Sequence, residues 1–297
     1  KRNFEYQKAI DGMRQILWGL FKKIVIADNC AELSNEIFNN YGDHSSASLA
    51  LGAIFFTFQI YGDFSGYSDI AIGTARLFGF KLMQNFAFPY FSRDIAEFWR
   101  RWHISLSTWF RDYLYIPLGG SKGGTWMKVK NTFIIFIVSG FWHGANWTFI
   151  VWGALNAFYF LPLLLTNNNR KNLDTVALGK WLPSIRELLS ISITFMLTVI
   201  AWIFFRAENL NHAFEYIYNL FSFSTTNNSS IGFESYIVLM ILIFFMLIEW
   251  LGRNNQYAIE KFSNWINKPI RWLFYLIITL IIFLFFGKEI TFIYFQF

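Results

Sequence analysis

The sequence predicts an all-α polytopic membrane protein, and three observations support this. Of its 297 residues, 55% are hydrophobic and only 15% are charged, whereas soluble domains carry about 45–50% apolar and about 25% charged residues. Aromatic residues make up 22% of the chain, a content typical of proteins with aromatic belts at membrane interfaces. Several apolar runs are also long enough to cross the hydrocarbon as helices, which takes about 20 residues.

Apolar runs along the chain mark the expected crossings. The clearest three lie in the second half, at residues 188–205, 236–251 and 272–286. Two more, 131–143 and 147–165, flank the sequence SGFWHGANWTF at residues 139–149. The apolar run 49–61 leads into a polar stretch, and we expect that helix to be broken there.

Two further segments favour helices that lie along the membrane interface or re-enter a cavity. In residues 93–113, apolar side chains recur at three- and four-residue steps, and polar side chains cover much of the opposite face. Residues 10–27 show a weaker form of this pattern, in which Lys22 and Lys23 are expected to reach past apolar surface to water. The glycines of residues 59–73 (QIYGDFSGYSDIAIG) indicate either a broken helix or close contact between helices.

Lysine and arginine in short loops set the expected orientation. The loops 166–187 and 252–271 are basic and are expected on the cytoplasmic side, whereas 206–234 is mostly acidic and is expected outside. The helix 131–143 then rises from the cytoplasmic side and places His143 about 18 Å along its length, at about 1.5 Å per residue. A side chain at that depth can meet reagents from both faces.

The net charge of +6 does not point to nucleic acid, because the positive charges lie in short loops between apolar runs. That distribution is typical of cytoplasmic loops beside anionic lipid. For one basic cluster, lipid anchoring competes with attraction of a phosphate-bearing donor, and its members are Arg93, Arg100, Arg101, Arg111, Lys122, Lys128 and Lys130. A single cysteine, Cys30, excludes an internal disulfide and a cysteine-based metal cluster.

Of the four histidines, His103 and His143 stand among Trp and Phe residues. An ionisable side chain at membrane depth is costly, so we expect His143 to act in function. A partly desolvated imidazole, with an ordinary pKa of about 6.5, stays neutral and can take a proton from a substrate hydroxyl. We expect Gly144 to let a substrate approach this ring. His103 either orients the second reactant or ties its helix to a neighbour, and His44 and His212 are expected to be structural.

Two carboxylates, Asp63 and Asp69, stand in the glycine-containing stretch. Together with two histidines they raise the question of a metal site. Their spacing fits no compact ligand motif, however, and no metal is predicted. For Asp69, a buried ion pair with Arg76, Arg93 or Arg111 is the better explanation.

Five blocks of the sequence together resemble the membrane-bound O-acyltransferase family. They are GLFKKIVIADN, YGDFSGYSDIAIG, FSRDIAEFWRRWHISLSTWFRDYLYIPLGG, SGFWHGANWTFIVWG and the terminal FIYFQF. Within the family they are most similar to the bacterial alginate and peptidoglycan O-acetyltransferases. The resemblance extends over essentially the whole chain, in order, and the blocks RWHISLSTWFRDY and WHG are the most specific.

The resemblance implies a ring of tilted transmembrane helices, with interfacial or re-entrant helices, around a central tunnel that joins a cytoplasmic donor to an external acceptor. On the family pattern, His143 corresponds to the catalytic histidine and His103 to a second one. The residues that we assign to substrate binding are Trp142, Asn146, Gln59, Asp63, Asp69 and Arg111. Residues 1–297 would form the catalytic core. Because family members carry further helices before this point, we expect the chain to be the C-terminal part of a longer protein.

The implied reaction is acetyl transfer from a thioester, acetyl-CoA, to a hydroxyl of a cell-surface polysaccharide or peptidoglycan. The thioester is a substrate, and no permanently bound cofactor is expected. A separate extracytoplasmic acetyltransferase is the expected partner, and the bacterial cytoplasmic (inner) membrane is the expected location. Two alternatives stay open. One is D-alanyl transfer to a cell-wall polymer, as in a related branch, and the other is a non-enzymatic transporter or flippase with a His and Asp proton relay.

Overall fold

The computed structural model describes residues 5–223 and 232–287, and within these ranges the chain is helical and contains no strand. The terminal block FIYFQF, which contributed to the resemblance, lies outside the described residues. The chain divides into two compact units. The first comprises the described residues 5–87 and 232–287, and the second comprises 88–223.

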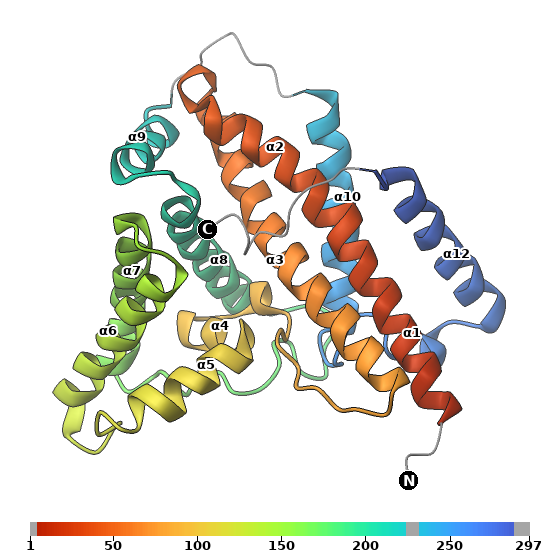
Figure 1. The fold of residues 1–297 in the computed structure, drawn as a ribbon, viewed down its shortest axis with the longest axis horizontal. Coiled ribbons are helices and arrows are strands. Elements are labelled where there is room, and N and C mark those ends of the chain that lie inside the picture. Colours follow the sequence, from red (N-terminus) through yellow and green to blue (C-terminus); the bar gives the residue numbers. More distant parts are fainter. Residues whose placement is uncertain (1–4, 224–231, 288–297) are drawn as a thin grey trace. The chain divides into compact units, whose positions relative to one another are not determined.

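The first unit is built on one long helical run that packs against one long helix. The run consists of α1 (Tyr6–Leu20), a π-helical stretch η1 (Phe21–Ala27) and α2 (Asp28–Asn39). After the 3-10 turn η2 (Tyr41–Asp43), helix α3 (Ser46–Leu77) returns alongside the run, as Figure 1 shows. The segment 10–27, expected at the membrane interface, is therefore part of a longer helix whose buried residues pack on α3.

The rest of the first unit comes from the C-terminal part of the chain. It consists of α10 (Phe233–Gly252), the short α11 (Phe262–Trp265) and α12 (Lys268–Phe285). Helix α10 packs on α2 and η1, and α12 packs on η1 and α1. The single cysteine, Cys30, is fully buried in α2.

Glycines bring α1 and α3 into backbone contact at two levels. A Cβ atom added at Gly66 would lie 2.8 Å from the carbonyl oxygen of Gly19, and one added at Gly19 would lie 2.6 Å from that of Gly66. Gly12 and Gly73 meet in the same reciprocal way. Small residues at such positions let helix backbones approach closely in membranes. Of the two explanations for the glycines, close helix contact is therefore correct.

The expected break after residue 61 is wrong, because α3 continues without interruption from Ser46 to Leu77. Its second half carries the polar side chains that suggested the break. Its two carboxylates are buried and meet partners on η1 rather than water, because Asp69 pairs with Lys22 and Asp63 pairs with Lys23. A helix whose polar groups find partners inside the unit has no need to unwind.

The second unit begins with short elements. They are η3 (Pro89–Phe91), α4 (Ile95–Arg101), α5 (Ile104–Phe110) and the π-helical turn η4 (Arg111–Tyr115). The expected single helix over 93–113 is thus broken between α4 and α5, at Trp102 and His103. The backbone of His103 lies in the left-handed region with φ of 44°, a conformation that no continuous helix of L-residues contains.

Longer helices complete the second unit. They are α6 (Gly124–His143), α7 (Trp147–Leu165), α8 (Ile185–Arg206) and α9 (Leu210–Phe221). Helices α6 and α7 form a hairpin that two glycines hold together (Figure 1). A Cβ atom at Gly140 would collide with the carbonyl oxygen of Phe149, and one at Gly153 would collide with that of Phe136.

Five of the described helices are long and apolar enough to cross a membrane, namely α3, α7, α8, α10 and α12. The spans expected from the sequence at 147–165, 188–205, 236–251 and 272–286 are confirmed among them within a few residues. Helix α6 is not one of the five. Lys128 and Lys130 occupy its first two turns, and the apolar part that follows is shorter than the hydrocarbon thickness of about 30 Å.

The contact between Gly19 and Gly66 predicts a sharp sensitivity to one methyl group. We expect Gly66→Ala to lower the free energy of unfolding by about 1–3 kcal/mol, because the added methyl meets backbone that cannot move aside. Thermal unfolding of the purified full chain in detergent measures the effect. Gly42→Ala is the matched control, because a Cβ atom at Gly42 meets nothing within 4 Å. Equal stability of the two variants would contradict the close contact.

Candidate functional site

The turn between α6 and α7 carries the histidine that the sequence singled out. Helix α6 ends at His143, and Asn146 caps the start of α7 by accepting a hydrogen bond from the backbone N–H of Thr148 at 3.1 Å. The amide nitrogen of Asn146 donates to the carbonyl oxygen of Glu208 at 2.8 Å. Both ends of the Asn146 amide therefore hold the turn, which competes with the substrate contact proposed for this residue.

The imidazole of His143 is half-buried in an aromatic cage. Its ring centre lies 5.0 Å from that of Phe205 and 5.3 Å from that of Trp152, and both contacts are edge-to-face. The neighbouring Trp142 ring, at 4.9 Å, is itself exposed. A ring in this setting is held in orientation by its neighbours while part of its surface stays open.

The expectation that Gly144 leaves space for a substrate is wrong. A Cβ atom at Gly144 would lie 2.6 Å from the ring of Phe149. The missing side chain therefore makes room for this phenyl group, which packs against Phe205 at 5.0 Å. Access to His143 has to come from another side of its ring.

His103 occupies the break between α4 and α5. A positive φ is uncommon outside glycine, and His is among the residues enriched there, while such strained positions cluster at functional sites. Burial lowers the pKa of His103 to about 4, so its ring is uncharged at neutral pH. His103 is close enough to His143 for a charge on one ring to affect the other. The structure thus brings the two predicted histidines together within one unit.

A network of indole rings connects the surroundings of the two histidines. Trp102, the residue before His103, lies 5.2 Å from Trp202 of α8, and Trp202 stacks on Trp152 at 5.7 Å. Trp99 contacts Trp152 at 5.7 Å, and its indole N–H donates to the Oδ1 atom of Asn156 at 3.2 Å. These contacts fix the α4–α5 break to the α7–α8 pair that forms the cage of His143.

Three arginines of the predicted basic cluster form ion pairs within the protein. Arg93 and Arg101 both pair with the buried carboxylate of Glu97, at 3.0 and 2.8 Å. Arg111, assigned to substrate binding, is exposed and pairs with its neighbour Asp112 at 2.7 Å. Nothing in this geometry directs Arg111 toward the histidines.

The other assigned binding residues, Gln59, Asp63 and Asp69, lie on α3 in the first unit. Asp69 forms a buried ion pair with Lys22 at 2.5 Å and accepts a hydrogen bond from Gln15 at 2.7 Å. The expectation of a buried ion pair is confirmed, but the expected partners are wrong. Arg76 pairs instead with Asp11, and Arg93 and Arg111 pair as described above.

Both lysines of η1 point inward rather than to water, which corrects the expected snorkelling. Lys22 is 3% exposed, and Lys23 pairs with Asp28 and Asp63, both at 2.8 Å. The nearby Gln59 side chain is 3% exposed, and its Oε1 atom has no hydrogen-bond partner among the described residues.

Glu249 is a buried carboxylate that the motif analysis missed. It lies on α10 and accepts hydrogen bonds from the hydroxyl of Tyr61 at 2.7 Å and from the indole N–H of Trp18 at 3.0 Å. The amino group of Lys22 lies 5.7 Å from the Tyr61 ring centre and belongs to the same network. Glu249 is the lone acidic residue inside the apolar run 236–251, and this could have identified it from the sequence. Ionisable residues within membrane segments are rare and usually pair with other polar groups.

His44 and His212, which were expected to be structural, are both packed among other side chains. The Nε2 atom of His44 lies 3.1 Å from a carboxylate oxygen of Glu36, and His212 is buried on α9 beside Tyr216. In the part of the chain that the structure describes, no group of three His, Cys, Asp or Glu side chains is arranged to hold a metal ion.

The described residues contain five candidate membrane-spanning helices, and the second unit also holds His103 and His143 at helix ends. These features define a polytopic membrane protein with ionisable residues among its helices. The chain belongs to the membrane-bound O-acyltransferase family, whose model matches residues 10–202, more than half of the chain.

Named relatives agree with this family. The chain is 42% identical over 231 residues to the "Probable alginate O-acetylase AlgI" of Pseudomonas aeruginosa, covering 78% of this chain and 42% of that protein. It is 42% identical over 195 residues to the peptidoglycan O-acetyltransferase of Helicobacter pylori, covering 66% and 36%. It is 32% identical over 166 residues to the teichoic acid D-alanyltransferase of Bacillus subtilis, covering 53% and 40%. The matches span less than half of the length of each of these relatives.

The buried ion pair between Lys22 and Asp69 allows a test of whether Asp69 is structural or binds substrate. Removing one partner leaves an uncompensated buried charge, so we expect Lys22→Met to destabilise the chain by about 3–5 kcal/mol. The double variant Lys22→Met/Asp69→Asn should regain most of that loss. Thermal unfolding of the native chain, of Lys22→Met and of the double variant measures both effects. If Asp69→Asn alone abolished acyl transfer at unchanged stability, the substrate role would stand instead.

Proposed function

We propose that this protein transfers an acetyl group from acetyl-CoA on the cytoplasmic side to a hydroxyl of an extracytoplasmic polysaccharide or peptidoglycan, in the bacterial inner membrane. The attacking hydroxyl would belong either to the polymer itself or to a separate extracytoplasmic acetyltransferase that passes the group on to the polymer. Family membership and the printed names of the relatives support this proposal. The single observation that carries it is the half-buried imidazole of His143, held between α6 and α7 beside an uncharged His103.

The chemistry follows from a neutral imidazole. An acceptor hydroxyl attacks the thioester carbonyl carbon, and His143 takes the hydroxyl proton as the C–O bond forms. The tetrahedral intermediate then collapses and the C–S bond breaks. The imidazolium returns its proton to the departing thiolate, which leaves an ester, a free thiol and a neutral His143. Such proton transfer contributes about 10²–10⁴-fold to the rate of comparable reactions.

The first test replaces the proposed base. We expect His143→Gln to reduce O-acetylation of the surface polymer by about 10²–10⁴-fold, the usual range for general acid–base catalysis. The measurement is acetate released from the purified polymer by mild base, from cells in which the gene is expressed in its own context. Immunoblotting of the membrane fraction shows whether the variant protein accumulates normally.

The matched control is His212→Gln, which removes a histidine from the same unit on α9. It should keep normal acetylation. Acetylation retained in His143→Gln at normal protein levels would reject the role of the base. Mass analysis of the polymer distinguishes acetyl from D-alanyl esters, and an unmodified polymer in cells with the native gene would favour a transporter.

His103 is expected to position the second reactant or His143 itself. Because asparagine tolerates positive φ, His103→Asn should remove the imidazole and keep the break between α4 and α5. We expect this variant to have the same melting temperature as the native protein. It should transfer acetyl more slowly, and the pH dependence of its transfer rate should change. His103→Ala, which lacks a side chain suited to that backbone, should lose stability as well. Native activity in the folded Asn variant would leave His103 with a packing role only.

A further inference from the structure

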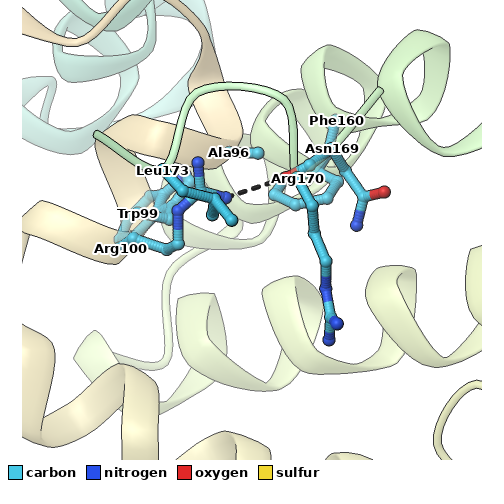
Figure 2. Close-up of a pocket in the computed structure, with 7 residues that line it drawn as sticks. All are labelled: Ala96, Trp99, Arg100, Phe160, Asn169, Arg170 and Leu173. Atoms are coloured by element: carbon cyan, nitrogen blue, oxygen red, sulfur yellow. Dashed lines mark hydrogen bonds between the residues drawn. The ribbon is translucent and has the colours of Figure 1, made fainter. Parts of the chain in front are cut away.

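A pocket of about 420 Å³ lies in the second unit, between α4, α7 and the loop that follows α7. Its volume falls within the range of about 300–1,000 Å³ that is usual for ligand sites. Figure 2 draws Trp99 and Arg100 on one side and Asn169 and Arg170 on the other. Neither His103 nor His143 lines the pocket, so it is separate from the proposed transfer site.

The remaining lining residues make the pocket apolar below its polar rim. Ala96 and Trp99 come from α4, Phe160 comes from α7 and Leu173 comes from the following loop. Phe160 lies within the last two turns of α7, a candidate membrane span that ends at Leu165. With α7 across the membrane, an apolar surface at this place would continue into the hydrocarbon.

The rim carries two positive charges without a carboxylate partner. The Nη1 and Nη2 atoms of Arg100 donate to the backbone carbonyl oxygens of Asn169 at 2.8 Å and Asn172 at 2.7 Å. In the described part of the chain, Arg100 forms no ion pair, and Arg170 forms neither an ion pair nor a hydrogen bond. Burial and the nearby charges of Arg101 and Arg170 lower the pKa of Arg100 despite the opposing Asp94 and Glu97. An anion between Arg100 and Arg170 would relieve their repulsion.

The position of the rim suits a membrane surface. Arg170 follows the end of α7 in the basic loop 166–187, which is expected on the cytoplasmic side, where anionic lipid is concentrated. The amide of Asn169 makes no side-chain hydrogen bond among the described residues and can donate to the same anion. The site therefore offers guanidinium and amide donors at the surface, with an apolar floor below.

We propose that this pocket binds an anionic glycerophospholipid, with its phosphate between Arg100 and Arg170 and one acyl chain along Phe160 and Leu173. Arginine is well suited to phosphate because its donors match the phosphate oxygens in pairs. The apolar floor favours a lipid over a water-soluble phosphate compound, which would leave that surface uncovered. The proposal is independent of the acyl-transfer reaction.

Native mass spectrometry of the full chain in detergent tests the proposal, with phosphatidylglycerol as the probe. We expect one tightly bound lipid in the native chain. Arg170→Gln should weaken its binding about tenfold, which corresponds to about 1.4 kcal/mol. Lys171→Gln is the matched control, because it removes the same charge from the adjacent, exposed residue outside the pocket. Leu173→Asp, which places a carboxylate on the wall, should also weaken binding.

Each other outcome overturns the proposal. Equal weakening in Arg170→Gln and Lys171→Gln would mean general attraction to the basic loop. Equal binding of phosphatidylcholine would show that the lipid's net charge is not recognised. Displacement of the lipid by coenzyme A at equal concentration, with loss of coenzyme A binding in Arg170→Gln, would assign the pocket to a soluble phosphate compound. None of these measurements depends on turnover, so failure here leaves the proposed acyl transfer untouched.

Discussion

The contact between α6 and α7 at two glycines is the constraint on which the proposed site depends. Because Gly140 and Gly153 lack side chains, the two helices touch through their backbones near the turn. The same hairpin carries His143 at the end of one helix and Trp152 on the other, so close packing presses the imidazole against the indole at 5.3 Å. Helix α8 adds Phe205 to the cage. A wider hairpin would leave the proposed base, His143, without the fixed orientation that proximity effects in catalysis require.

Both units bury ion pairs, and the second, in which Arg93 and Arg101 pair with Glu97, also holds the two histidines. In the first, charges on η1, α3 and α10 are satisfied by one another, through Lys22 with Asp69 and through Tyr61 and Trp18 with Glu249. Such pairs are costly to bury, and they favour one arrangement of helices over others because each partner has a defined place. In the second, aromatic rings surround His143, and burial keeps His103 uncharged. Paired charges suit a scaffold, and an uncharged imidazole suits proton transfer.

Much of this was predictable from local sequence, and the failures have a common cause. Helix α7 was predicted with its observed bounds, and His103 and His143 were both singled out as candidate site residues, because hydropathy and motifs are properties of neighbouring residues. Periodicity did not reveal the left-handed backbone of His103, since one reversed residue leaves the apolar spacing of 93–113 intact. The partner of Asp69 was assigned wrongly because ion pairing depends on which helices meet. Likewise, Gly144 faces Phe149, a contact that only the folded turn defines.

The burial of Cys30 has a practical consequence. Cys30 is the only cysteine in the sequence, and its side chain on α2 is fully buried. A membrane-impermeant maleimide therefore cannot reach its sulfur. Reporter cysteines introduced at exposed sites such as Trp142 or Lys171 can therefore be labelled in the otherwise native chain. Their labelling from one side of a sealed vesicle or the other would establish which ends of the helices face the cytoplasm, without any cysteine-free background.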